Sequence, residues 1–178
     1  DICISVAGRR RGGPAKVAVI SSAAMGTISG SSIANVVTTG TLTIPMMKKT
    51  GFTPEEAGAI ETCASTGGQI MPPIMGTGAF ILAETVGIPY SNVCIVSIIP
   101  ALLFYIAIYF LVDLTARKRG LHGLPASEIT PLKQTMRAGG AFFIPILVLV
   151  TLLVIGYTPF LSGVGCTILI LIIAQLRK

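Results

Sequence analysis

The sequence predicts an all-α polytopic membrane protein, and three features of the chain carry this prediction. Hydrophobic residues make up 52% of its 178 positions and charged residues only 11%. The mean hydropathy is +0.84. Soluble domains carry about 25% charged residues, so this composition is typical of a chain that lies mostly in lipid. The third feature is the placement of the cations, which are confined to short clusters between apolar segments.

All 13 Lys and Arg residues fall into five clusters, and we expect every cluster to lie on the cytoplasmic face. Positive residues beside membrane segments favour that side. The net charge of +6 is therefore a topology signal, and we expect no nucleic-acid partner. The clusters are Arg9, Arg10, Arg11 and Lys16; Lys48 and Lys49; Arg117, Lys118 and Arg119; Lys133 and Arg137; Arg177 and Lys178.

Residues 15–49 are predicted to form a re-entrant helical hairpin, after a cytoplasmic lead-in over residues 1–14. The chain must leave and regain the cytoplasmic side between Lys16 and Lys48. Two full spans need about 40 residues, and this interval is too short for them. A hairpin that turns at Ser29-Gly30-Ser31 fits. The alternative is one long polar span, which would place Lys48 and Lys49 outside.

The hairpin turn lies in an unusually polar stretch, Gly-Thr-Ile-Ser-Gly-Ser-Ser-Ile-Ala-Asn, at Gly26 to Asn35. A polar group without a partner in hydrocarbon costs roughly 2–7 kcal/mol. The stretch therefore faces a water-accessible cavity or is buried against other protein. We predict that it forms half of an ion or substrate site.

Residues 53–87 are predicted to form a discontinuous transmembrane helix. Thr53 as N-cap, Pro54 at the first helical position and two glutamates in the first turn give a strong helix start. Two glycines and two prolines then interrupt the helix within Thr66-Gly67-Gly68-Gln69-Ile70-Met71-Pro72-Pro73. We expect an inner half at Pro54–Ser65 and an outer half at Ile74–Val86.

The rest of the chain alternates apolar and polar segments. Residues 93–113 are predicted to be a full transmembrane helix, followed by a cytoplasmic loop over residues 114–139 with a surface helix near Pro131–Arg137. Two further transmembrane helices are expected at residues 140–157 and 160–176. Because the chain begins without Met and ends directly after an apolar run, we expect it to be part of a longer protein.

The two interruptions offer neutral oxygen ligands. A half-helix that ends inside the bilayer presents carbonyl groups to cations at its C-terminus and N–H groups to anions at its N-terminus. Neutral oxygens suit a monovalent cation such as Na⁺. The alternative is that these small residues only permit close helix packing. The oxygens come from Ser29, Ser31, Ser32 and Asn35 at the first interruption and from Thr66, Gly67, Gly68 and Gln69 at the second.

Other polar residues give no sign of an enzyme. The serines have no nearby histidine, because His122 is the only histidine and falls in a cytoplasmic loop. The four cysteines lack metal-site spacing, so we expect no cofactor and no metal other than Na⁺. Glu61 and Glu84 are the acidic residues well inside apolar segments, and an intramembrane carboxylate is a functional candidate. Contact with water at the membrane surface is the alternative for each.

Several segments resemble the large membrane subunit of TRAP (tripartite ATP-independent periplasmic) transporters. The resemblance covers residues 5–120 well. Residues 36–40, Val-Val-Thr-Thr-Gly, resemble the branch with fused subunits and TAXI-type binding proteins. The matching motifs are Gly8–Val19, Gly26–Val36, Ile44–Phe52 and Gly67–Pro73. Much of the family has serine after the double proline, whereas Ile74 follows it here, so this position offers no hydroxyl group.

The resemblance implies a Na⁺-coupled importer of organic acids in the bacterial or archaeal cytoplasmic membrane. Its fold would be an inverted-repeat, elevator-type transporter. Its partners would be a periplasmic substrate-binding protein and a small membrane subunit or its fused equivalent. Alternatives are a Na⁺/dicarboxylate carrier without a binding protein and an ion channel with a re-entrant loop. The implied Na⁺ ligands are Ser29, Ser31, Ser32, Asn35, Gly67 and Gly68, and the implied substrate-lining residues are Gly30, Thr66, Gln69, Pro72 and Pro73.

Overall fold

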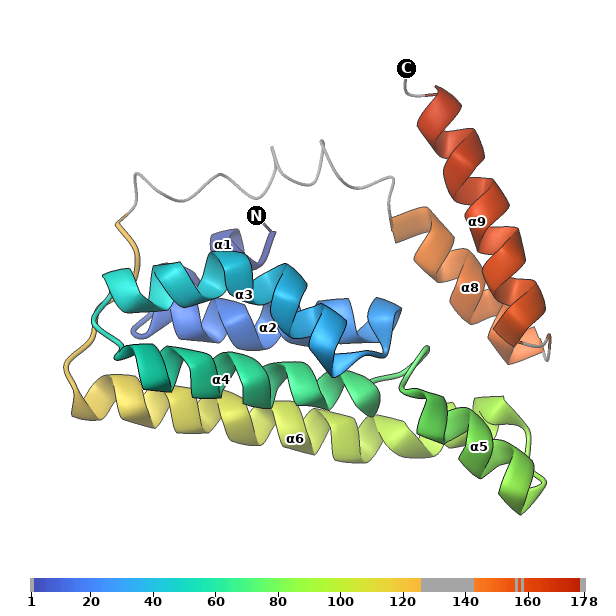
Figure 1. The fold of residues 1–178 in the computed structure, drawn as a ribbon, viewed down its shortest axis with the longest axis horizontal. Coiled ribbons are helices and arrows are strands. Elements are labelled where there is room, and N and C mark those ends of the chain that lie inside the picture. Colours follow the sequence, from blue (N-terminus) through green and yellow to red (C-terminus); the bar gives the residue numbers. More distant parts are fainter. Residues whose placement is uncertain (1, 126–142, 156, 158, 177–178) are drawn as a thin grey trace.

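The computed structural model describes residues 2–125, 143–155, 157 and 159–176. These residues form helices joined by turns, with no strand among them, so the predicted all-α class is confirmed (Figure 1). The elements are α1 (Ile2–Ala7), α2 (Gly13–Ser29), α3 (Ser32–Lys49), α4 (Pro54–Thr66), the 3₁₀ turn η1 (Gly67–Gln69), α5 (Thr77–Val86), α6 (Tyr90–Lys118), α8 (Phe143–Ile155) and α9 (Pro159–Leu176).

Helices α2 and α3 run antiparallel and lie side by side as a helical hairpin (Figure 1). Helix α2 ends because Gly30 adopts a left-handed conformation, with φ of 61°, and its N–H donates to the Gly26 carbonyl over 3.3 Å. Helix α3 starts at once because the Ser31 hydroxyl accepts a hydrogen bond from the Ala34 N–H over 3.3 Å. Glycine and serine thus turn the chain within two residues.

Helix α4 begins with a full capping box. The Thr53 hydroxyl accepts from the Glu56 N–H over 3.3 Å, and the Glu56 carboxylate accepts from the Thr53 N–H over 3.1 Å. After η1 the backbone is irregular, and α5 starts only at Thr77. The second half of the interrupted helix therefore begins three residues later than the predicted Ile74. The chain is still bent at Gly76, because the Gly76 N–H donates to the Gln69 carbonyl over 2.8 Å.

Helix α6 runs for 29 residues and extends beyond the predicted 93–113 at both ends. In the part of the chain that the structure describes, it is the one helix both long and apolar enough to cross a membrane. The predicted loop from residue 114 therefore starts as the last turns of a helix. The predicted surface helix near Pro131–Arg137 lies outside the described residues. Helices α8 and α9 pack on each other beside the main bundle (Figure 1).

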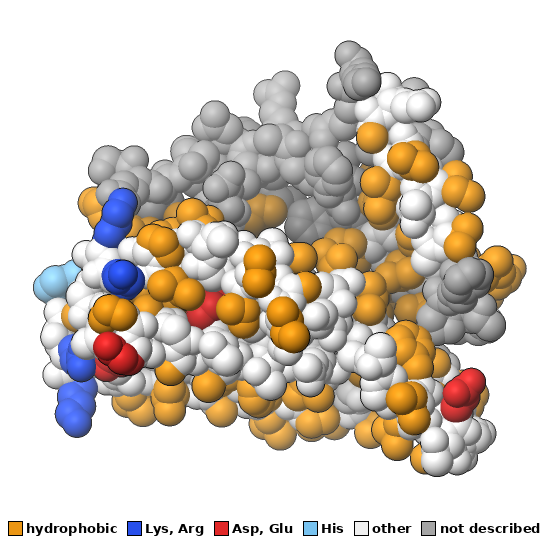
Figure 2. Space-filling view, in the orientation of Figure 1, with side chains coloured by type: hydrophobic (Ala, Val, Ile, Leu, Met, Phe, Trp, Pro, Cys, Tyr) orange, Lys and Arg blue, Asp and Glu red, His pale blue; other side chains and the backbone are white. Residues whose placement is uncertain are grey.

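The core lies between α2, α3, α4 and α6, where small side chains allow close approach. Much of it is alanine, with a few larger side chains such as Met47, Val19 and Val112 that are also fully or nearly fully buried. The outer face of α6 is different, because Val96, Ile99 and similar residues stay more than half exposed. Hydrophobic side chains cover much of the surface in Figure 2. A surface of this kind suits lipid or further protein rather than water.

Cationic side chains gather at one end of the molecule, on the left in Figure 2. This end contains the C-termini of α3 and α6, which carry their basic residues in the last turn. Asp113 of α6 pairs there with the nearly buried Lys16 of α2 over 2.5 Å and with Arg117 over 2.8 Å. Arg119 pairs with Glu56 of α4 over 2.8 Å. Ion pairs therefore tie α2 and α4 to α6 at the basic end.

Candidate functional site

A cavity of about 670 Å³ lies beside the hairpin tip and the interruption between α4 and α5. Ser29, Gly30 and Ser31 line it from the hairpin, and Gln69 lines it from η1. The remaining wall comes from the irregular segment after η1, from α5 and from α6. The structure thus brings four of the predicted site residues around one space. The other lining residues are Ile70, Ile74, Met75, Gly76, Thr77, Gly78, Ala79, Phe80, Leu82, Val93 and Ser97.

The N-terminus of α5 forms part of this cavity wall. Thr77 and Gly78 are its first two residues, and Gly76 before them has no side chain with which to cap their N–H groups. A helix N-terminus carries a partial positive charge and unpaired N–H donors. Ser29 and Ser31 of the hairpin tip line the same cavity and carry hydroxyl groups. Helix N–H donors suit a carboxylate, and neutral oxygens suit a cation.

Close contacts hold the hairpin tip against the interruption. The Gln69 amide donates a hydrogen bond to the Ser32 hydroxyl over 3.0 Å. A Cβ atom at Gly30 would lie 1.9 Å from the Met75 carbonyl oxygen, so only glycine fits at the turn. Tyr90 in turn donates to the Ile74 carbonyl over 2.5 Å, which ties the irregular segment to α6. The cavity walls are thus fixed to three separate elements.

Three of the proposed Na⁺ ligands, Asn35, Gly67 and Gly68, are not among the residues that line this cavity. Asn35 is fully buried and its amide donates to the Ser22 carbonyl over 2.9 Å. Gly68 packs against it and against Gly26, whose Cβ would lie 2.5 Å from the Gly68 Cα atom. A Cβ at Gly67 would clash with Phe104 and Tyr105 of α6. Close packing is therefore one role of both glycines, and their ion-binding role stays a prediction.

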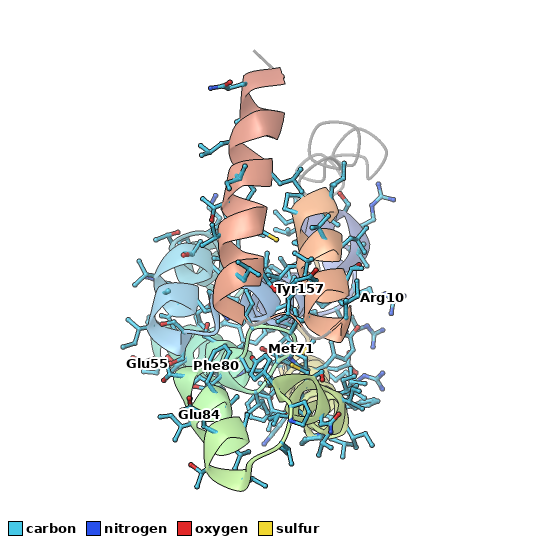
Figure 3. All side chains as sticks on the ribbon, turned by 90° about the vertical axis from the view of Figure 1, so that its right-hand side faces the viewer. Arg10, Glu55, Met71, Phe80, Glu84 and Tyr157 are labelled. Carbon is cyan, nitrogen blue, oxygen red and sulfur yellow. The ribbon has the colours of Figure 1, made fainter. Side chains whose placement is uncertain are left out.

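Three proposed substrate-lining residues face other spaces. Thr66 lines a smaller cavity of about 250 Å³, to which Ser32 also contributes. Pro72 and Pro73 line a largely apolar cavity of about 540 Å³ between the interruption, α6 and α8. Figure 3 shows Met71, which lines that apolar cavity, and Phe80 of α5, which stacks on Tyr90 with ring centroids 4.3 Å apart. The interrupted segment thus separates two chemically different cavities.

The structure also shows a polar cluster that the sequence prediction did not assign. Glu61 is fully buried, and its carboxyl group contacts the hydroxyl groups of four residues on α2, α3 and α4. The i, i+4 spacing of Thr39 with Thr43 and of Glu61 with Ser65 was a signal that could have revealed it. Glu84, by contrast, is exposed and lies towards the outer end of α5 in Figure 3.

Comparison with known proteins agrees with this architecture. The family model described as "Tripartite ATP-independent periplasmic transporter, DctM component" matches residues 1–178. The chain belongs to this family. No solved structure matches it.

Two curated relatives illustrate how the chain relates to known proteins. It is 28% identical to protein y4mL of Sinorhizobium fredii over 146 residues. This aligned region covers 81% of this chain and 34% of that protein. It is 28% identical over 135 residues to the C4-dicarboxylate TRAP transporter large permease protein DctM of Vibrio cholerae, covering 76% of this chain and 29% of that protein. The chain therefore spans about a third of the length of these relatives. The resemblance to the large membrane subunit of TRAP transporters is confirmed.

Proposed function

We propose that this chain is the part of a TRAP transporter permease that forms one coupling-ion site and one side of the substrate path. The full permease would import organic acids into the cell together with Na⁺, across the bacterial or archaeal cytoplasmic membrane. The observation that carries this proposal is the cavity between the hairpin tip and the N-terminus of α5. Such paired half-helix ends are a common design for ion and carboxylate sites in secondary transporters.

Charge placement supports a re-entrant hairpin. Lys16 near the start of α2 and Lys48 at the end of α3 belong to the same basic end of the molecule (Figure 2). Helix α2 has 17 residues and α3 has 18, which gives each arm a length of about 26 Å at ~1.5 Å per residue. The hydrocarbon core is about 30 Å thick. Both arms therefore start at the cytoplasmic face, and the polar tip ends within the bilayer.

The donors at the cavity set the class of substrate. Thr77 and Gly78 present the positive end of a helix, and no carboxylate lines the cavity among the residues that the structure describes. An anion such as an organic carboxylate is suited to this end, and Na⁺ beside the hairpin hydroxyls would offset its charge. The permease would receive the acid from a periplasmic binding protein and would work with a small membrane subunit or its fused equivalent. The hairpin and the interrupted helix would move together across the membrane in an elevator-type movement, as part of an inverted-repeat fold.

Uptake into proteoliposomes tests the proposal. The complete permease, with its membrane partner and binding protein, is reconstituted and supplied with radiolabelled dicarboxylates, with Na⁺ or an equal concentration of K⁺ outside. We expect uptake only with an inward Na⁺ gradient. Equal uptake in K⁺ would refute Na⁺ coupling. Equal uptake without the binding protein would instead identify a stand-alone carrier.

A further inference from the structure

Gln69 joins the hairpin to the chain that leads into α5. Its side-chain amide donates to the hydroxyl group of Ser32, the first residue of α3, over 3.0 Å. Its backbone carbonyl accepts from the N–H group of Gly76, the residue before α5, over 2.8 Å. Gln69 and Gly76 both line the cavity beside the hairpin tip. One residue therefore connects the start of α3 with the start of α5.

Within the described part of the chain, the bond from Gln69 to Ser32 is the one side-chain hydrogen bond that joins the polar hairpin tip to the interruption after α4. The other close contacts between these two regions involve backbone atoms. Gly26 packs on Gly68, and a Cβ atom at Gly26 or at Gly30 would clash with the backbone that it faces. The amide of Gln69 is therefore the part of this connection that a substitution can remove without introducing a clash.

The bond to Ser32 adds little to the stability of the fold. Gln69 is exposed, whereas the core of the bundle consists largely of alanine and a few larger apolar side chains. A hydrogen bond between exposed groups replaces bonds that each group would make to water. Folding alone therefore does not require a long amide side chain at this position. The placement of Gln69 on the cavity wall points instead to a role in what the cavity binds.

The two bonds of Gln69 end beside the groups that the proposed function assigns to different ligands. Ser32 follows Ser31, which caps α3 and lines the cavity. Gly76 precedes Thr77, which is the first residue of α5 and also lines the cavity. The hairpin hydroxyls suit Na⁺, and the start of α5 suits a carboxylate. A shift of the hairpin tip toward a bound ion therefore reaches the start of α5 through a single residue.

We propose that Gln69 is a positioning residue that couples Na⁺ binding at the hairpin tip to anion binding at the start of α5. The coupling runs from the Ser32 hydroxyl through the amide to the backbone of Gln69, and from its carbonyl group to Gly76. Coupling between two sites is reciprocal, so each ligand should raise the affinity for the other. This inference rests on the proposed function and adds the residue through which the two ligands influence each other.

Uptake measured over a range of Na⁺ concentrations tests the coupling. The complete permease is reconstituted with its membrane partner, and the radiolabelled dicarboxylate that it takes up is supplied on the binding protein. In the wild type, we expect Na⁺ to lower the concentration of loaded binding protein for half-maximal uptake several-fold. In Gln69→Ala this effect of Na⁺ should shrink to less than about twofold, because the bond to Ser32 is lost. A rise by the same factor at every Na⁺ concentration would identify direct contact between Gln69 and the acid, and would overturn the proposal.

Substitutions at Ser32 test whether the hydrogen bond carries the coupling. Because Ser32 is itself a proposed Na⁺ ligand, the decisive comparison is between Ser32→Ala and the double variant that also has Gln69→Ala. If the bond is the route, the second substitution should have no further effect, whereas independent effects would add. Ser32→Thr keeps a hydroxyl group and should keep the wild-type effect of Na⁺. The matched control is Thr38→Val, because the exposed Thr38 on the same helix donates only to the Ala34 carbonyl; it should behave as wild type.

Thermal unfolding of the same variants in detergent separates coupling from folding. Gln69→Ala should unfold at nearly the wild-type temperature, because its side chain is exposed; a large drop would show a structural role and overturn the proposal. Additive effects of the two substitutions, or an unchanged effect of Na⁺ in Gln69→Ala, would overturn it as well. Wild-type uptake that does not depend on Na⁺ would refute the proposed function itself, so the two failures are distinguishable.

Discussion

The hairpin carries two groups of polar side chains whose surroundings differ. At its tip, Ser29 and Ser31 line a cavity that is large enough for an ion and a small anion. In its middle, Thr39 and Thr43 contact the fully buried Glu61, and no buried polar side chain among the described residues lacks a partner. Similar hydroxyl groups thus line an open cavity in one place and bond to a buried carboxyl group in the other.

The difference shows that polarity alone does not identify a site in a membrane protein. Polar residues at the tip leave hydrogen-bonding capacity unused, because the hairpin turn and the interruption after α4 leave a cavity beside them. Residues in the middle use their capacity on one another, since α2, α3 and α4 pack closely there through alanine and glycine. Substitutions in the middle should therefore affect stability first, and substitutions at the tip should affect ion binding first.

The largest expected effect is on stability at Glu61. Glu61→Leu leaves the hydroxyls of three buried residues and of the half-buried Thr39 without their common partner. We expect the free energy of unfolding to fall by about 3 kcal/mol. Glu61→Gln keeps an acceptor and a donor in place and should cost less than half of that. Thermal and denaturant unfolding in detergent measure both. If the two variants were equally unstable, the side-chain shape rather than the hydroxyl network would control packing in the middle.

The contact between Gly26 and Gly68 should show an intermediate effect. A Cβ atom at Gly26 would lie 2.5 Å from the Gly68 Cα atom, so Gly26→Ala must push η1 away from α2. We expect a loss of about 2 kcal/mol in the free energy of unfolding and weaker Na⁺-dependent uptake.

Gly58→Ala is the matched control for this contact. Gly58 lies inside α4 with nothing within 4 Å of its Cβ position, so the alanine should stabilise the helix by about 0.5–1 kcal/mol. A Gly26→Ala variant as stable as Gly58→Ala would show that the tip and the interruption are not held in close contact.

The smallest effect on stability, but a direct one on ion binding, is expected for Ser29→Ala. The Ser29 hydroxyl makes only weak contacts of 3.4 Å within the turn, so the free energy of unfolding should change by less than about 0.5 kcal/mol. The Na⁺ concentration for half-maximal uptake should rise several-fold. Asn35→Ala is a less specific test, because Asn35 also supports the core through its bond to Ser22. An unchanged Na⁺ dependence in Ser29→Ala would remove Ser29 from the ion site.

Sequence alone determined the all-α class, the hairpin turn and the interruption of the second helix. These follow from local chemistry, because glycine, proline and N-capping residues act within a few positions, and clusters of cations mark one side of a membrane. The same local reasoning placed the helix N-cap at Thr53 and the turn at Gly30 correctly.

Tertiary structure decided which polar residues meet. Asn35 and Gly68 are buried in the core, and Pro72 and Pro73 face an apolar cavity, although all four lie within four positions of a residue that lines the polar cavity. Glu61 could not be assigned from the sequence, because its partners come from three helices and are separated by as many as 39 positions. Helix rotation and packing set those contacts, and no local pattern encodes them fully.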